Sequence, residues 1–366
     1  METGTLNLSF ERSPDKCRIT IENHIISRLP RETFSGASSI AIVSDDIVSK
    51  LYAAKVKYRL SRFAKTEVIT IKHGEKNKNI NTSSEIAAKM NNLGLDRKSI
   101  VVALGGGVVG DMVGFVSSIF KRGVKYVQMP TSLLAQVDSS IGGKTGVDTN
   151  WGKNQIGSFY QPVAIFIDPS VLDTLPDVEV VNGLGEMIKS GIIADKKLFQ
   201  SIERIDSPTI QDLKQLITPA VNVKAGVVEA DERETSLRSI LNYGHTVGHA
   251  IEAASEFMLS HGKCVILGMV AEGWIAAQLG IFNESDLERQ NALLRSIIKR
   301  SITAGKLDTR RILGFAIRDK KSTGSTIKMA LPERIGRMHK TSDGNYLVTV
   351  SQKLFTDSLQ ELLSDI

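Results

Sequence analysis

The first half of the chain alternates between short apolar runs and segments with the apolar periodicity of an amphipathic helix. The apolar runs, each bounded by Gly, Pro, Asp or Lys, lie at residues 39–43, 67–71, 100–104, 126–129 and 164–167. Strands that alternate with helices are typical of a parallel sheet, so this half predicts an α/β domain with a Rossmann-like fold. Two further stretches, 6–10 and 18–22, alternate in hydrophobicity and predict a β pair added to that sheet.

After Leu175 the pattern changes, and most segments from 182 to about 301 have helical periodicity, with breaks expected near Pro208, Pro219 and Gly280. A late pair of stretches, 326–331 and 346–350, predicts a small hairpin. A chain of 366 residues is too long for one ordinary core. We therefore expect two domains, an α/β domain over residues 1–178 and a mainly α-helical domain over residues 179–366.

A glycine-rich loop follows the third of the predicted parallel strands, where Gly105-Gly-Gly-Val-Val-Gly110 matches G-x-G-x-x-G. Glycines between a strand and a helix let the backbone approach a pyrophosphate at the helix N-terminus. The motif alone is weak, and a plain tight turn between strand and helix is the alternative. It also lacks the usual acidic residue about 20 positions on. Asp45, at the end of the first strand run, is the alternative partner for ribose hydroxyls, whereas Glu75 and Lys78 could belong to a charged surface loop.

Histidine is clustered: three of the six histidines are His245, His249 and His261. Imidazoles one helical turn apart lie on one face of a helix, which pairs His245 with His249. With a third imidazole and the carboxylate of Glu186, which we expect to open a helix, they form an N/O ligand set suited to catalytic zinc. The alternative is a helix whose histidines hydrogen-bond within a core.

Cationic and small polar residues are densest between Pro130 and Asn154. Glycine-exposed backbone with ammonium groups nearby suits a small molecule that carries phosphate and carboxylate groups. Lys189 follows Glu186 by three residues, on the same helical face. Any one of these charges could be a solvated surface residue, but their placement around a metal candidate favours an anion site.

Together these segments resemble the 3-dehydroquinate synthases of the sugar-phosphate cyclase family. The resemblance runs from about Ala41 to Gly336. It rests on five motifs, GGGVVGDMVGF, KRGVKYVQMPTSLLAQVDSSIGGKTGVDTNWGKNQIGSFYQP, GEMIKSGII, LRSILNYGHTVGHAIEAA and the DKK at Asp319–Lys321. It implies conversion of 3-deoxy-D-arabino-heptulosonate 7-phosphate to 3-dehydroquinate and phosphate. The implied steps are transient oxidation by NAD, β-elimination of phosphate, re-reduction and intramolecular aldol closure, in the shikimate pathway of aromatic amino acid biosynthesis.

The resemblance also implies the roles of individual residues. The metal ligands become Glu186, His245 and His261, which replaces the pairing of His245 with His249 that spacing alone suggests. The substrate site is implied for Asp138, Lys144, Asn154, Lys189, Lys224, Arg238, Asn242 and His249. Lys153 stands between substrate and cofactor, and Asp138 and Lys144 also border the cofactor. The family's NAD site falls on Asp45, Glu75, Lys78, Gly106, Gly107, Val108, Asp111, Thr131, Ser132, Thr174 and Leu175. The metal is Zn²⁺, with Co²⁺ as a substitute, and the proton acceptor is either His249 or the substrate phosphate.

Three further implications concern single positions. Arg122 matches an arginine that reaches the neighbouring subunit's site, so a homodimer is expected. Lys320 or Lys321 closes over the substrate. The sequence departs from the family pattern at Ser132, where threonine is common, and at Lys263, where glutamate is usual; the second change leaves the support of His261 open.

The composition of the chain indicates which classes of binding partner and which cell compartment to expect. The net charge is +6, but the basic residues are spread along the chain and only 5% of residues are aromatic, so nucleic acid is not an expected partner. No apolar run reaches the roughly 18 residues of a membrane span, and the first residues do not resemble a secretion signal. Cys17 and Cys264 lack metal-ligand spacing, and such isolated thiols fit a reducing cytoplasm.

Other functions remain as alternatives. One alternative is a sister cyclase, such as a 2-deoxy-scyllo-inosose or amino-dehydroquinate synthase. Gly142-Gly-Lys144-Thr and the Arg238-x-x-x-Asn242 spacing favour a carboxylated substrate instead. A metal-dependent alcohol dehydrogenase would release NADH stoichiometrically, and a non-catalytic binding protein would leave the cationic residues without a role in turnover.

Overall fold

A computed structural model describes residues 4–10, 13–150, 152–256, 258–301, 308–318 and 326–364. The chain divides into two compact units, Met1–Leu175 and Pro176–Ile366. The first unit is built on a seven-stranded sheet of β1 (Gly4–Phe10), β2 (Ser13–Ile21), β3 (Ser39–Asp45), β4 (Lys65–Ile71), β5 (Ile100–Gly105), β6 (Lys125–Pro130) and β9 (Ala164–Ile167). The predicted α/β class is confirmed, because all the pairs are parallel except the added β1–β2 pair.

The strand order is β1-β2-β9-β6-β5-β3-β4. From β3 the chain first adds β4 on one side and then β5 on the other, so the direction of winding reverses between β3 and β5. In open α/β sheets, ligands bind beyond the carboxyl ends of the strands at such a reversal. The ends of β3 and β5, at Asp45 and Gly105, therefore mark the expected binding edge.

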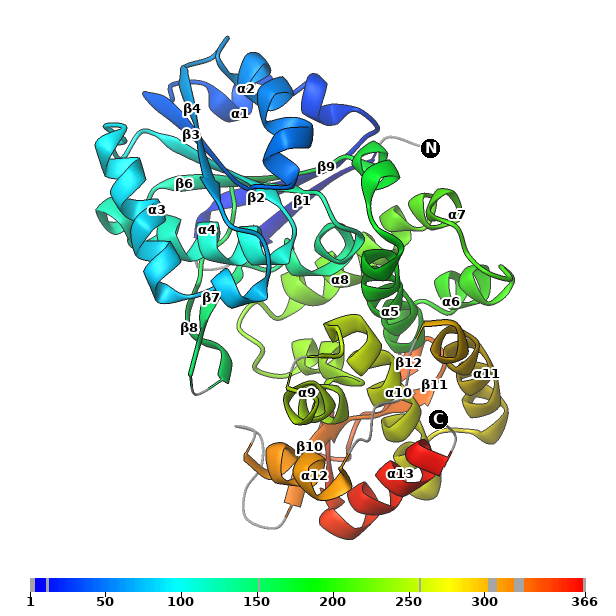
Figure 1. The fold of residues 1–366 in the computed structure, drawn as a ribbon. Helices are drawn as coiled ribbons and strands as arrows, with labels where there is room; N and C mark the ends of the chain where they lie inside the picture. Colours follow the sequence, from blue (N-terminus) through cyan, green and yellow to red (C-terminus); the bar gives the residue numbers. More distant parts are fainter. Residues whose placement is uncertain are drawn as a thin grey trace. The chain divides into compact units, whose positions relative to one another are not determined.

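Helices cover both faces of this sheet (Figure 1). One face packs in an apolar cluster with α3 (Ile80–Asn92) and α4 (Gly107–Ile119), the other in a cluster with α1 (Arg31–Phe34) and α2 (Ala54–Leu60). All six residues of β5 are buried, as expected for a central strand between two helical layers.

A two-stranded hairpin within the glycine-rich segment of the first unit was not predicted. It pairs β7 (Lys144–Thr149) antiparallel with β8 (Gly152–Phe159). Its glycines allow the two backbones to approach closely, since a Cβ on Gly157 would lie 2.2 Å from the carbonyl oxygen of Thr145. The Asp148 N–H donates to the Lys78 carbonyl over 2.8 Å, which ties the hairpin to the loop after β4.

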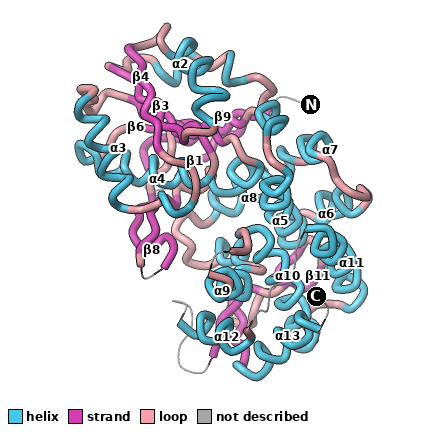
Figure 2. The backbone as a smooth tube through the Cα atoms, viewed as in Figure 1, coloured by secondary structure: helices cyan, strands magenta, loops and turns pink. Residues whose placement is uncertain are grey.

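The second unit is mainly helical, as predicted (Figure 2). Its helices are α5 (Asp177–Ala194), α6 (Lys196–Glu203), α7 (Ile210–Lys214), α8 (Ile217–Ala230), α9 (His245–Ala254), α10 (His261–Gln278), α11 (Glu284–Ser301), α12 (Thr309–Arg318) and α13 (Gln352–Ser364). The two late strands that were predicted do pair antiparallel, as β10 (Thr326–Ala330) and β13 (Leu347–Ser351), but they do not form a simple hairpin, because two short strands lie between them in the chain. A second small pair, β11 (Pro332–Arg334) with β12 (Arg337–Met338), was not foreseen.

Two local expectations in this unit were wrong. Glu186 does not open a helix, because α5 begins at Asp177 and runs through it. Pro219 does not break a helix either. It lies in the first turn of α8, where the missing N–H would have no partner within the helix anyway. No helix in the described part of the chain is long and apolar enough to cross a membrane.

Candidate active site

Three helices of the second unit bring Glu186, His245 and His261 together, and we call these residues the metal cluster. Glu186 lies in the middle of α5, and the two histidines are the first residues of α9 and α10. α10 packs against both of the other helices.

Glycines allow these helices to approach closely. A Cβ on Gly262, next to His261, would lie 2.4 Å from the Asn182 Cα of α5. A Cβ on Gly268 of α10 would lie 1.9 Å from the carbonyl oxygen of Gly244, the residue before α9. Larger side chains at either position would force the ligand-bearing helices apart.

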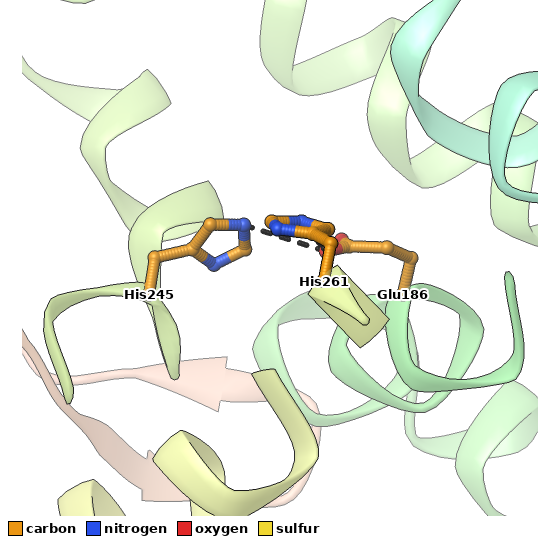
Figure 3. A group of neighbouring side chains, drawn as sticks. All are labelled: Glu186, His245 and His261. Atoms are coloured by element: carbon orange, nitrogen blue, oxygen red, sulfur yellow. Dashed lines mark ion pairs between the residues drawn. The ribbon is translucent and has the colours of Figure 1, made fainter. Parts of the chain in front are cut away.

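The ligand atoms of the metal cluster converge (Figure 3). Oε1 of Glu186 is 3.4 Å from Nε2 of His245 and 3.5 Å from Nε2 of His261. One ligand atom from each residue lies within 4.8 Å of the other two. The Nδ1 of His245 is 3.1 Å from the Tyr243 carbonyl, so a proton on Nδ1 donates there and the lone pair of Nε2 faces Glu186.

Charges around Glu186 keep it ionised. The ammonium of Lys189, one turn along α5, contacts Oε2 of Glu186, as the three-residue spacing predicts. Burial acts to raise the pKa of the Glu186 carboxyl, but Lys189 and then His245 hold it well below its ordinary value. Burial and Lys189 hold the pKa of His245 below its ordinary value, which favours the neutral imidazole that ligates metals.

His261 has a carboxylate on each side of its ring. Burial acts to lower the pKa of His261, but Glu186 and Glu252 together raise it to about 9. Oε2 of Glu252, from α9, is 3.5 Å from Nδ1 of His261. His249 is exposed one turn into α9, with its ring centroid 5.1 Å from that of His245. The structure therefore places His245 and His261, rather than His245 and His249, next to Glu186.

The metal cluster fits a cation. Both carboxylate oxygens of Glu186 are buried without a hydrogen bond of good geometry, although two imidazoles and an ammonium lie at ion-pair distance. The Lys189 ammonium compensates Oε2, whereas Oε1 faces only the two imidazole nitrogens and is the carboxylate oxygen placed to coordinate a metal ion. Two imidazole nitrogens and a carboxylate oxygen are the ligand set of catalytic zinc sites, which keep a position open for substrate.

Other predicted cations of this unit are also buried. Lys224 of α8 and Arg238 of a short 3-10 helix, Leu237–Asn242, lie on elements that pack against α5. Asn242, at the end of that 3-10 helix, donates from Nδ2 to Oε1 of Glu234 over 2.5 Å. Buried lysine and arginine side chains are rare outside paired or ligand-binding positions.

In the first unit, the glycine loop lies at the reversal of the sheet. Gly106 precedes α4 and provides no side-chain cap, so the first N–H groups of the helix have no partner within it. A Cβ on Gly106 would lie 3.3 Å from Oγ of Ser132, and one on Gly107 would lie 3.0 Å from Oγ of Ser139. The loop is thus a narrow cradle of bare backbone, and Val108 continues it into the helix.

Beside this loop is a second polar group, which we call the lysine cluster: Lys78, Asp111 and Asn154. The Lys78 ammonium donates to Oδ2 of Asp111 over 2.7 Å and to Oδ1 of Asn154 over 2.6 Å. Burial acts to lower the pKa of Lys78, but Asp111 and then Glu75 raise it to about 12. Nζ of Lys153 is 3.3 Å from Oε1 of Glu75, so residues implied for cofactor and substrate meet here.

Three more of the predicted cofactor residues, Asp45, Thr131 and Thr174, make hydrogen bonds within the first unit. Asp45 accepts from the N–H groups of Ile47 and Val48, both over 2.9 Å, and so caps the helical segment after β3. The Thr131 N–H donates to the Gly105 carbonyl over 3.0 Å. Thr174, just before Leu175, shares a 2.7 Å hydrogen bond with the Tyr52 hydroxyl.

Asp138 is half-buried in a turn packed against α4, and Lys144 is exposed at the start of β7. Arg122 is exposed and has a left-handed backbone, with φ of 66°. Lys320 and Lys321 lie outside the described residues.

Sequence reasoning missed four acidic residues: Asp148, Glu234 and Glu252, which contact predicted site residues, and Glu272, which contacts the backbone on either side of His245. One of them carried a signal. Glu272 is the only charged residue between positions 264 and 277, within an otherwise apolar or small-residue helix. Its exposure is 0%, and a charged side chain is almost never fully buried unless it is paired.

Comparison with known proteins gives the same family for both units. A family model described as 3-dehydroquinate synthase N-terminal matches residues 68–182, and one described as 3-dehydroquinate synthase C-terminal matches residues 183–322. A 3-dehydroquinate synthase of Thermodesulfovibrio yellowstonii is 41% identical over 83% of this chain and 87% of its own length. A 3-dehydroquinate synthase of Prochlorococcus marinus is 38% identical over 97% of this chain and 99% of its own length.

Among solved structures, a 2-deoxy-scyllo-inosose synthase complexed with carbaglucose-6-phosphate, NAD⁺ and Co²⁺ matches with a TM-score of 0.88. It is 25% identical, and the match covers 98% of this chain and 99% of that one.

Proposed function

Because the chain belongs to the 3-dehydroquinate synthase family, we propose that it converts 3-deoxy-D-arabino-heptulosonate 7-phosphate to 3-dehydroquinate and phosphate. It is an enzyme of the carbon–oxygen lyase type that acts on a phosphate, in the shikimate pathway. The observation that carries the proposal is the metal cluster, whose acceptor atoms converge within a family match that spans both units.

For the metal, we propose Zn²⁺, or Co²⁺ in its place, held by Glu186, His245 and His261. The solved synthase named above contains Co²⁺, which supports this class of ion. When bound, such an ion supplies a Lewis acid that lowers the pKa of a substrate hydroxyl and polarises a carbonyl. Lys189 keeps Glu186 ionised, and the Tyr243 carbonyl fixes the His245 tautomer.

For the cofactor, we propose NAD at the end of the parallel sheet, along the bare backbone of Gly106, Gly107 and Val108. The N-terminus of α4 provides N–H groups and a favourable dipole for a pyrophosphate. NAD is the dinucleotide in the complex of the solved synthase. When bound, it supplies a hydride acceptor that returns the hydride within the same turnover.

For the substrate, we propose that the buried cations Lys189, Lys224 and Arg238 bind its anionic groups. Charge-assisted hydrogen bonds from buried cations are strong and fix the orientation of a phosphate or carboxylate. They also supply preorganised positive charge where negative charge develops. His249 is the exposed imidazole beside the metal cluster, and we assign it as the proton acceptor.

The test is phosphate release from the heptulosonate phosphate, with glucose 6-phosphate as the control substrate. We expect release from the first substrate only, without a lasting rise in NADH absorbance, since the hydride is returned. Release from glucose 6-phosphate alone would assign the chain to a sister cyclase. NADH that accumulates in step with product would assign it to the alcohol dehydrogenases instead.

We further propose a cytoplasmic homodimer in which Arg122 completes the phosphate site of the neighbouring subunit. Arg122 is exposed, and both cysteines of the chain are free thiols, as the cytoplasm allows. Arg122→Ala and His245→Ala, each nearly inactive alone, should complement when their subunits exchange. A mixed dimer would hold one intact site, so random mixing restores about a quarter of all sites. Exchange demonstrated by mass without recovery would show that Arg122 does not act in trans.

A further inference from the structure

The start of α9, which carries His245, lacks a cap from its own sequence. The cap position is Gly244, with a left-handed φ of 78° and no side-chain hydrogen bond. A side chain is excluded there, because a Cβ would lie 2.6 Å from Cγ of Met269 and 2.9 Å from the Val265 carbonyl oxygen. Helices without a local cap leave their first N–H groups unsatisfied unless another group reaches them.

Glu272 of α10 supplies that cap from the neighbouring helix. Its Oε2 accepts from the Gly244 N–H over 2.7 Å, and its Oε1 accepts from the Val247 N–H over 2.9 Å. These N–H groups stand on either side of His245. A carboxylate at a helix N-terminus also interacts favourably with the helix dipole. Glu272 thus fixes the turn from which the His245 imidazole projects.

The reverse contact comes from α9. Glu252, two turns beyond His245 and only 4% exposed, places Oε2 3.5 Å from Nδ1 of His261, the first residue of α10. The other ring nitrogen of His261 faces Glu186 at 3.5 Å. A carboxylate behind a metal-binding imidazole fixes its ring orientation and raises its basicity.

We propose that Glu272 and Glu252 are reciprocal positioning residues of the metal centre. Each of the helices α9 and α10 carries one histidine of the metal cluster and one buried carboxylate. Glu252 of α9 faces the imidazole of His261, and Glu272 of α10 caps the turn that carries His245. This inference rests on the proposed metal site and deepens it. Its consequence is that metal affinity depends on both carboxylates, although neither belongs to the metal cluster.

The substitutions Glu272→Gln and Glu252→Gln keep size and remove charge. At position 272 an amide N–H would face a backbone N–H, and at position 252 the imidazole would lose its charged acceptor. Glu272→Asp and Glu252→Asp keep the charge but shorten the side chain by one methylene. Where a Gln variant does not fold, the zinc affinity of the Asp variant tests the positioning role instead. The matched control is Asp286→Asn. Asp286 is likewise buried in this unit and accepts a backbone N–H, that of Ile335, over 3.0 Å.

Zinc affinity is measured by competition with a chromophoric chelator, and unfolding by urea is measured on the same samples. We expect roughly 10–100-fold weaker zinc binding for the substitutions at 272 and 252, as is typical of residues that orient metal ligands. The visible absorption spectrum of the Co²⁺-loaded protein should change with them. Asp286→Asn should lose stability but keep the wild-type zinc affinity and Co²⁺ spectrum.

Two results would overturn the inference. Wild-type affinity and spectrum in folded variants at both positions would show that the carboxylates only stabilise the fold, while the metal site itself would stand. Wild-type protein that binds no stoichiometric zinc would overturn the metal site and this inference together.

Discussion

The metal cluster in the second unit and the lysine cluster in the first are built in opposite ways. In the metal cluster, two imidazole nitrogens converge on Oε1 of Glu186, and the Lys189 ammonium contacts only the other oxygen, Oε2. In the lysine cluster, an ammonium already lies between two acceptors, at 2.7 Å from Asp111 and 2.6 Å from Asn154.

This difference suggests that the metal cluster binds an ion, whereas the lysine cluster stabilises the fold. Three ligand atoms that converge on one point can hold a metal ion, so substitutions of the two histidines should remove a ligand and leave the fold. A buried ion pair is complete by itself, so substitutions there should cost stability first. In the first unit, we therefore expect the bare glycine backbone beside the lysine cluster to contact the cofactor phosphates, while the predicted roles of Lys78, Asp111 and Asn154 at the ligand stay predictions.

The largest expected effect is at the metal cluster. His245→Ala and His261→Ala should each lose stoichiometric metal, and phosphate release should fall by more than the roughly 10–100-fold typical of residues behind the ligands. His249→Ala should keep its metal and lose turnover, because its imidazole is exposed and lies outside the Glu186 contacts. Elemental analysis with a phosphate assay checks both; equal metal loss in all three variants would contradict the ligand assignment.

At the lysine cluster, Lys78→Ala should lower the free energy of unfolding by about 3–5 kcal/mol, because it leaves the Asp111 carboxylate buried without its cation. Lys72→Ala is the matched control: its side chain is 82% exposed and pairs with Asp46 at the surface, so the loss should be below about 1 kcal/mol. Urea unfolding measures both. Equal stability of the two variants would remove the distinction between the clusters.

Substitutions of two glycines in α4 should separate an effect on stability from an effect on NAD binding. A Cβ on Gly114 would lie 2.3 Å from Cγ2 of the buried Thr145, so Gly114→Ala should cost about 1–3 kcal/mol by overpacking. A Cβ on Gly107 would meet the rotatable Ser139 hydroxyl at 3.0 Å, so Gly107→Ala should cost less stability than Gly114→Ala. The added methyl group would stand in the backbone cradle proposed for the pyrophosphate, so the substitution should weaken NAD binding. Calorimetric titration with NAD and thermal unfolding separate the two effects; the opposite pattern would move the cofactor away from this loop.

The smallest effect is at Asp231, which holds the loop before Arg238. Burial acts to raise the pKa of Asp231, but backbone N–H groups of Thr235, Arg238 and Ser236 lower it to about 2. Because the folded-state pKa lies below the ordinary 3.8, the stabilisation is present above about pH 4 and is lost as the pH falls toward 2. Asp231→Asn should therefore cost on the order of 1–2 kcal/mol at pH 7 and almost nothing near pH 2. Urea unfolding at both values tests this, and a cost independent of pH would contradict it.

Much of the first unit could be predicted from the sequence, because its parallel strands are buried on both faces and therefore appear as apolar runs. The β7–β8 hairpin could not be predicted, since its glycines carry no alternating pattern and its position depends on Lys78, far away in the sequence. The start of α5 was also misplaced. Gly183 and Gly185 weaken the helical pattern, but packing against α10 holds the helix together there, and a Cβ on Gly185 would lie 2.9 Å from the Gly262 carbonyl oxygen.

The metal cluster shows a similar limit. Spacing alone pairs His245 with His249, because both lie on one face of α9. The structure places His261 beside Glu186 instead, since the start of α10 packs against α5. The lysine at position 263 left the support of His261 open, and Glu252 fills that role from another helix. Glu272 was missed for the same reason, as its partners lie more than twenty residues away.

The central claim is that Glu186, His245 and His261 hold a metal required for the synthase reaction, and metal titration tests it most directly. Metal-free protein, verified by elemental analysis, is titrated with Zn²⁺ or Co²⁺ while phosphate release from the heptulosonate phosphate is measured. We predict no release without metal and a linear recovery that ends at one ion per chain. Full release from metal-free protein, or recovery that does not level off at one ion, would contradict the account.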